Sequence, residues 1–264
     1  MRIALGLSYR GTAYRGWQSQ PDGQTVQDRL EAALAAFIDS PVRVRCAGRT
    51  DAGVHALHQV VHLDTEVQRA ATSWTRGTNR YLPPDISVQW ARPVAADFDA
   101  RFNALGRRYV YILLESPVRP GMEAGAVGWT FRTLDGQAMR DAAAMLLGEH
   151  DFSALRSAEC QAASAVRTIR RIDIRRQGAY WRFDFDANAF LHHMVRNIMG
   201  CLVAIGSGTH RPAWMTEVLG SRDRSRAAPT FAPDGLYFAG PYYDAVHAIP
   251  ERVASLDWLP APPL

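Results

Sequence analysis

Ile3-Ala-Leu-Gly-Leu-Ser-Tyr9 opens the chain with strict alternation, its larger apolar side chains falling at every second position. A period of two is typical of a β-strand with one buried face. The next periodic segment, residues 26–37, repeats apolar residues at helical spacing, and Thr25 with Asp28 provides an N-terminal cap. The chain therefore begins with a strand and a helix, which a Gly-rich loop over residues 10–23 connects.

The later segments continue this order and then repeat it. In the first half the patterns predict strands at 42–46, 59–63 and 86–91, with a helix at 72–79. In the second half they predict strands at 108–114, 165–174, 180–187 and 236–240, with helices at 134–147 and 191–205. Both halves read β-α-β-β-α-β, which favours the α+β class with two ferredoxin-like or RNA-recognition-like units, each an antiparallel sheet with helices on one face. We place the domain boundary between the halves 1–105 and 106–264.

Composition narrows the protein class. The 264 residues are 47% hydrophobic, enough for one large domain or two of ordinary size. No window approaches the roughly 18 apolar residues of a membrane span, and the first residues lack the pattern of a secretion signal. The three cysteines show no paired spacing, so we expect neither a disulfide framework nor a zinc site. A reducing cytoplasm fits best, and the Pro-rich end, Pro260–Pro263, is expected to be a loosely held tail.

All 30 basic residues are arginine, and the chain contains no lysine. This excludes a lysyl Schiff base, the usual attachment of pyridoxal phosphate, and the Gly-rich phosphate loop that ends in Lys. The net charge is only +4, but seven arginines lie within residues 156–182 and four within 101–119. Such clusters suit a phosphate backbone, and they equally suit the solvated face of a strand.

The segment Cys46-Ala-Gly-Arg-Thr-Asp-Ala-Gly-Val-His55 joins two predicted strands and places the carboxylate of Asp51 close to Arg49. Loops anchored between strands commonly carry functional groups, and a nearby guanidinium favours the ionised carboxylate. The alternative interpretation is a simple Thr-Asp-Ala-Gly turn.

A second segment, residues 188–200, places Arg196 and Asn197 one turn after His192 and His193 on a predicted apolar helix. A buried guanidinium requires an anionic partner, because an unpaired buried charge costs several kcal/mol. Asp51, Asp184, Asp186 or a nucleic-acid phosphate could each provide it. The two histidines are expected to point about 100° apart on the helix.

Two further patterns allow a functional and a structural interpretation. His55, His58 and His62 suggest a metal site, but strand spacing would separate His58 from His62 by about 13 Å, so we expect no metal. Tyr109 and Tyr111 should project from one face of a strand that follows Arg107 and Arg108. They would form either a stacking surface for an unpaired base or part of a sheet core.

Taken together, these segments resemble the tRNA pseudouridine synthase A family. The resemblance extends from residue 3 to about residue 243 in the expected order. It is carried by the Asp51 segment and by six further motifs: residues 9–18, 97–104, 107–111, 148–152, 187–200 and 235–237.

The resemblance implies a cofactor-free isomerase that converts uridine to pseudouridine at positions 38, 39 and 40 in the anticodon arm of tRNA. By carry-over, Asp51 is the nucleophile, Tyr109 stacks on the target uracil, Arg196 pairs with Asp51, and Arg49 helps hold the RNA. It further implies a homodimer whose target enters a cleft between the two halves of one chain. Arg170 and Arg171, on an Arg-rich strand, are expected to contact the RNA backbone.

Several alternatives remain open at this point. A non-catalytic RNA-binding module would not need Asp51. A glycosidic hydrolase would pair Asp51 with Asp184 or Asp186 and use water, and a His-based metallohydrolase would depend on a divalent ion. For the isomerase, Asp51 could attack the sugar C1′, attack the uracil ring, or deprotonate the sugar to give a glycal.

Overall fold

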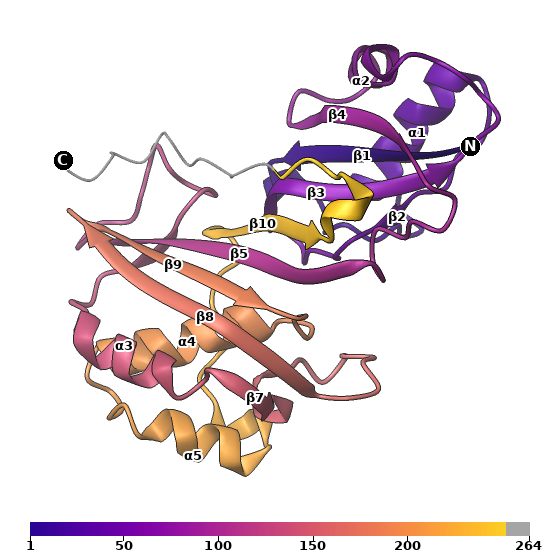
Figure 1. Cartoon of the computed structure of the whole chain (residues 1–264). Helices are drawn as coiled ribbons and strands as arrows, with labels where there is room; N and C mark the ends of the chain where they lie inside the picture. The colour runs from indigo at the N-terminus through magenta and orange to yellow at the C-terminus, as the bar shows by residue number, and fades with distance from the viewer. Residues whose placement is uncertain (252–264) are drawn as a thin grey trace. The chain divides into compact units, whose positions relative to one another are not determined.

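The computed structural model describes residues 1–251, and the chain divides into two compact units (Figure 1). Unit 1 comprises residues 1–107 and 237–251, and unit 2 comprises residues 108–236. The boundary expected from the sequence lies between residues 105 and 106. It differs from the observed division because the last strand of the chain belongs to unit 1. The expected tail at Pro260–Pro263 lies outside the described residues.

Unit 1 is a sheet with two helices. Its elements are β1 (Arg2–Tyr9), α1 (Val26–Ile38), β2 (Arg45–Cys46), β3 (His55–Asp64), α2 (Ala71–Asn79), β4 (Ile86–Val94) and β10 (Leu236–Tyr243). β1 lies between β4 and β3 and is antiparallel to both, β2 is antiparallel to β3, and β10 runs parallel to β3. This arrangement of the first six elements confirms the expected β-α-β-β-α-β order.

Helix α1 begins where the sequence predicts. The hydroxyl oxygen of Thr25 accepts a hydrogen bond from the backbone N–H of Asp28, which satisfies one of the unpaired donors of the first turn. The helix ends at Asp39, whose φ of 56° lies in the left-handed region. The cap and the helical period therefore fix this element from local sequence alone.

Strand β1 differs from the expectation of one buried face, because both of its faces are buried. Ala4 belongs to a core cluster that also contains Val60, Phe98 and Tyr243. At Gly6, an added Cβ would lie 2.1 Å from the ring of Trp90. Small residues at alternate positions of β1 therefore allow other side chains to pack directly on the sheet.

Unit 2 is also a sheet with helices, and Figure 1 shows the helices gathered on one side of β8 and β9. Its elements are β5 (Ala104–Glu115), β6 (Gly128–Thr130), α3 (Gly136–Ala144), β7 (Gly148–Asp151), β8 (Val166–Gln177), β9 (Tyr180–Ala187), α4 (Met194–Gly206) and α5 (Trp214–Ser221). The sheet has the order β5-β9-β8-β7, with β6 parallel to β5. The α+β class is thus confirmed.

Several predicted bounds in both units need correction. The strand expected at 42–46 contains only Arg45–Cys46, and the helix expected at 134–147 ends at Ala144, because Gly148–Asp151 pairs with β8. The short strand β6 and helix α5 were not predicted. Among residues 1–251, no helix combines the length and apolar content needed to cross a membrane.

Candidate active site

The Asp51 segment connects β2 to β3 of unit 1, as predicted. Thr50, the residue before Asp51, anchors the backbone of this segment. Thr50 is buried, and its hydroxyl lies 2.8 Å from the hydroxyl of Tyr9. The carbonyl of Thr50 accepts the backbone N–H of Trp17 at 2.9 Å. These contacts position the half-buried Asp51, the next residue along the chain.

After Asp51 the chain forms a tight turn. The carbonyl of Asp51 accepts the backbone N–H of Val54 at 3.1 Å, and Gly53 has a φ of 80°. The Thr-Asp-Ala-Gly turn is therefore present, but it does not exclude a chemical role. A carboxylate held on a closed turn is better oriented for reaction than one on an extended loop.

Two glycines of the loop after β1 pack against the backbone on either side of Asp51. At Gly16, where φ is 85°, an added Cβ would lie 2.7 Å from the carbonyl oxygen of Thr50. At Gly11, an added Cβ would lie 1.9 Å from the carbonyl oxygen of Val54. Backbone packed directly on backbone leaves no room for side chains at Gly11 and Gly16, which explains why glycine occupies these two positions.

A cysteine thiol also lies beside this turn, at the end of β2. Burial raises the pKa of the Cys46 thiol to about 12, although Arg49 and Arg101 act in the opposite direction. The thiol is thus protonated at neutral pH and is not a nucleophile. Arg49 itself is exposed, two positions before Asp51.

The three histidines of β3 each accept a hydrogen bond from a different donor. Nδ1 of His55 accepts the backbone N–H of Gly11, and Nδ1 of His62 accepts that of Ala100, both at 3.0 Å. Nε2 of His58 lies 3.2 Å from Nε1 of Trp90. The rings therefore serve separate parts of unit 1, and His55 also stacks on Tyr237 at 4.6 Å between ring centroids.

In unit 2, the two tyrosines of β5 have different environments. Tyr111 is 0% exposed, and its hydroxyl donates to the carbonyl of Ala232 at 2.9 Å, so it belongs to the core. Tyr109 is half-buried and meets Phe190 edge-to-face at 5.1 Å between centroids. The core interpretation therefore holds for Tyr111, while the ring of Tyr109 remains partly accessible.

Arg196 lies in the first turn of α4, and its guanidinium is hydrogen-bonded within unit 2. Nε donates to the carbonyl of Phe231 at 2.8 Å, and the backbone N–H of Phe231 donates to the carbonyl of Arg196 at 3.1 Å. At Gly200, one turn further, an added Cβ would lie 2.2 Å from the carbonyl oxygen of Pro229. The segment before β10 thus packs against the backbone of α4 and orients Arg196.

The neighbouring Asn197 has a structural role that sequence reasoning missed. It is 0% exposed, its amide donates to the carbonyl of Leu155, and its Oδ1 accepts from both Thr230 and Arg224. One amide therefore connects three segments of unit 2. An isolated Asn on an apolar helix was the available signal, because a buried amide requires partners.

The two adjacent histidines are not on a helix, contrary to the expectation. α4 begins at Met194, and His193 is its N-cap residue with a φ of 61°. The rings of His192 and His193 lie 4.0 Å apart between centroids. Because His193 has a left-handed backbone conformation, the two histidines are not related by helical geometry. The expected angle of about 100° between their side chains therefore does not apply.

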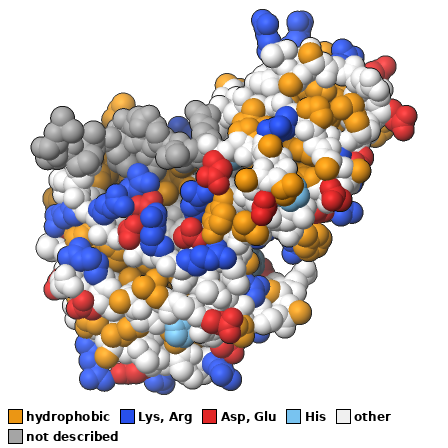
Figure 2. Space-filling view, viewed as in Figure 1, with side chains coloured by type: hydrophobic (Ala, Val, Ile, Leu, Met, Phe, Trp, Pro, Cys, Tyr) orange, Lys and Arg blue, Asp and Glu red, His pale blue; other side chains and the backbone are white. Residues whose placement is uncertain are grey.

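Arg170 and Arg171 are exposed on β8, and both lie within ion-pair distance of carboxylates of unit 2. Arg170 lies 3.5 Å from Asp186, and Arg171 lies 3.3 Å from Asp173. Arg182 reaches Asp184 through Nε and Nη2. Figure 2 shows basic and acidic side chains interleaved in this region. Asp184 and Asp186 are thus engaged by arginines of their own sheet, which disfavours their use in a hydrolase pair.

Comparison with known proteins defines the class to which this chain belongs. A family model described as tRNA pseudouridine synthase matches residues 7–103 and 142–244. The first range contains the whole Asp51 segment, and the second contains Arg170, Arg171 and Arg196, whereas Tyr109 lies between the two ranges. The class is that of RNA-modifying isomerases.

Relatives agree over the full chain. The tRNA pseudouridine synthase A of Methylibium petroleiphilum is 72% identical over 260 residues, covering 98% of this chain and 100% of the relative. Those of Polaromonas naphthalenivorans and Paracidovorax citrulli are 62% and 60% identical with the same coverage. The chain belongs to the tRNA pseudouridine synthase family and isomerises uridine to pseudouridine in tRNA.

Proposed function

We propose that the chain modifies uridines 38, 39 and 40 in the anticodon arm of tRNA and that Asp51 is its catalytic nucleophile. The observation that supports this role is the half-buried carboxylate on a turn held by Thr50 and backed by Gly11 and Gly16. During the isomerisation the N1–C1′ bond breaks and a C5–C1′ bond forms, while C5 loses its proton to solvent and N1 takes up a proton, so that the atoms of the base are conserved. Attack at C1′, attack on the ring and glycal formation all require an ionised carboxylate at this position.

Tyr109 and Arg196 complete the proposed site. Tyr109 stacks on the target uracil once the nucleotide leaves its helix, an extrusion that costs a few kcal/mol and that stacking offsets. Arg196 pairs with Asp51 and keeps it ionised. Its Nε contact with Phe231 supports this role, because it holds the guanidinium in one orientation.

The remaining contacts concern the RNA and the assembly. Arg49, exposed beside Asp51, positions the RNA, and Arg170 and Arg171 contact its backbone. The enzyme acts as a homodimer in the cytoplasm, where its tRNA substrate is found, and needs no cofactor.

Tritium release from tRNA labelled at uracil C5 tests the proposed chemistry. Asp51→Asn preserves size and removes the charge, so we expect release to fall by at least about 10²–10⁴-fold while tRNA binding is retained. Asp39→Asn is a matched control, because Asp39 is an exposed carboxylate of unit 1 in a left-handed conformation that Asn also adopts.

The outcomes separate the alternatives. Full tritium release by Asp51→Asn would remove Asp51 from the mechanism. Release of free uracil by the wild-type protein would instead indicate hydrolysis. Mapping pseudouridine in the product tRNA tests the position, since modification outside positions 38–40 contradicts the assigned substrate site.

A further inference from the structure

A tight turn in unit 1, residues 99–103, presents an aromatic ring and a guanidinium to solvent. Phe102 is 75% exposed, which is unusual for a side chain of this size. The guanidinium carbon of Arg101 lies 5.4 Å from the centroid of the Phe102 ring. Two adjacent residues thus combine an exposed aromatic ring with a positive charge.

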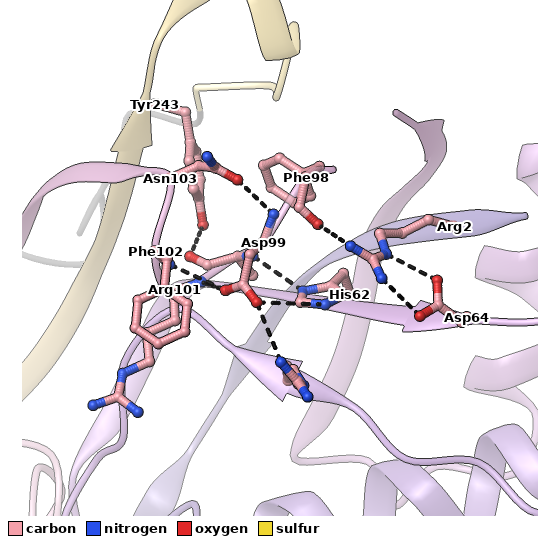
Figure 3. A network of polar contacts seen from close by, with 11 residues as sticks. Arg2, His62, Asp64, Phe98, Asp99, Arg101, Phe102, Asn103 and Tyr243 are labelled. Atoms are coloured by element: carbon pink, nitrogen blue, oxygen red, sulfur yellow. Dashed lines mark hydrogen bonds and ion pairs between the residues drawn. The ribbon is translucent and has the colours of Figure 1, made fainter. Parts of the chain in front are cut away.

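The turn is rigid because almost every backbone group has a partner. The carboxylate of Asp99 accepts the backbone N–H groups of Arg101 and Phe102 at 2.8 and 3.0 Å. The carbonyl of Asp99 accepts the N–H of Asn103 at 3.0 Å, and the carbonyl of Ala100 accepts the hydroxyl of Tyr243 at 2.7 Å. Figure 3 shows this network, with Phe102 and Arg101 projecting away from His62. An exposed aromatic on so constrained a turn loses little entropy on binding.

The same turn is tied to the segment that carries Asp51. Arg107 donates from Nη2 to the carbonyl of Ala47 at 3.0 Å and to the carbonyl of Arg101, which lies in the turn. Ala47 and Ala100 belong to one core cluster. Hydrogen bonds and core packing therefore connect the start of the Asp51 segment to the exposed turn.

Arg101 supplies this turn with a positive charge that an anionic partner can neutralise. Among residues 1–251, no carboxylate pairs with Arg101, whereas Arg170 and Arg171 on β8 both have carboxylate partners. Arg45 reaches Asp99 only at 3.6 Å, and its side chain is 73% exposed. Both Arg49 and Arg101 influence the Cys46 thiol electrostatically, so the two guanidinium groups lie near the same residue.

We propose that Phe102 stacks on an unpaired base of the tRNA outside the target nucleotide, while Arg101 contacts the adjoining phosphate. Aromatic rings bind bases by stacking, and arginine neutralises the backbone, so the pair suits a flexed single-stranded nucleotide. The proposal rests on tRNA being the substrate and adds an RNA contact beyond the catalytic site.

Binding of unmodified tRNA to three variants tests the pair. Phe102→Leu keeps an apolar side chain but removes the π-face, and we expect Kd and KM to rise about 5- to 150-fold. Phe102→Trp restores stacking and should bind within about twofold of wild type. Arg101→Gln should reduce the slope of log K against log salt by about 0.7–0.9, the value for one phosphate contact.

Phe131→Leu in unit 2 is the matched control. Phe131 is 65% exposed and also has an arginine near its ring, but Arg132 donates to Thr209. We expect its tRNA affinity to equal that of wild type. Equal losses at Phe102 and Phe131, or wild-type affinity in Phe102→Leu, would overturn the assignment.

Two outcomes distinguish the loss of the Phe102 contact from the loss of the Asp51 mechanism. If wild-type enzyme forms pseudouridine and Phe102→Leu binds tRNA normally, only the turn loses its role. If Asp51→Asn retains activity while Phe102→Leu binds weakly, the RNA contact stands without the proposed nucleophile.

Discussion

The Asp51 segment of unit 1 and the β8–β9 face of unit 2 both combine arginine with aspartate, yet they are built in opposite ways. The Asp51 turn is held by backbone hydrogen bonds and by glycine backbone pressed against it. On β8 and β9, exposed arginines pair with carboxylates of the same sheet. Similar composition therefore produces a constrained carboxylate in one region and a largely self-neutralising surface in the other.

The difference shows where substitutions should matter. A glycine at which two backbone segments touch cannot be replaced without moving the backbone, because protein interiors are close-packed. An exposed ion pair contributes about 0–1 kcal/mol and tolerates change. Sensitivity should therefore follow contact geometry and not the density of charge in the sequence.

The largest effect is expected at Gly16. Gly16→Ala forces a Cβ to within 2.7 Å of the carbonyl oxygen of Thr50 at a φ of 85°. We expect about 2–4 kcal/mol lower stability and a larger loss of pseudouridine formation, since the Asp51 turn must shift. Urea unfolding and tritium release measure the two effects.

Gly23→Ala separates backbone strain from the close contact. Gly23 has a φ of 65°, but an added Cβ there meets nothing within 4 Å. We expect about 1–2 kcal/mol lower stability and unchanged catalysis. If Gly16→Ala and Gly23→Ala change stability and catalysis equally, the Asp51 turn adapts to the added Cβ. The turn would then not be more constrained than the β8–β9 face.

An effect smaller than that of Gly16→Ala is expected at Asn197, which tests whether unit 2 contains a site as constrained as the Asp51 turn. Asn197→Ala leaves the carbonyl of Leu155 and the donors of Thr230 and Arg224 without this partner. We expect about 1–3 kcal/mol lower stability in urea unfolding.

A double-mutant cycle with Thr230→Ala identifies the source of that loss. Thr230 donates to Asn197 Oδ1 at 2.7 Å, so the two substitutions should be coupled by about 0.5–3 kcal/mol. Strictly additive effects would mean that Asn197 acts through packing and not through its hydrogen bonds.

The sequence predicts the regular parts of this molecule well and its close contacts poorly. Strand β9 matches the expected bounds 180–187, because Trp181, Phe183 and Phe185 alternate strictly with charged residues. Periodicity likewise identifies α1. By contrast, β6 contains only Gly128–Thr130, too short a segment for any period to appear.

The parts of the site that escaped prediction depend on distant segments. Nothing local indicates that Gly16 approaches Thr50 or that Asn197 meets Thr230, because these contacts arise only when separate loops pack together. The left-handed conformation of His193 was also hidden, since the residue continues an apparently helical pattern. Residue type identified Asp51 as a candidate, and tertiary packing determines how firmly it is held.

The smallest effect on stability is expected on the β8–β9 face, where Arg170 and Arg171 are replaced together by Ala. Both side chains are exposed and weakly paired, so the free energy of unfolding should change by less than about 1 kcal/mol. If both also contact phosphates, the salt slope of tRNA binding falls by about 1.5–2. Arg211→Ala is the control, because Arg211 is an exposed arginine of unit 2 paired with Glu217. If the salt slope of tRNA binding changes no more than in this control, the arginines of β8 and β9 only neutralise the carboxylates of their own sheet. The RNA contacts must then come from arginines without carboxylate partners, such as Arg101.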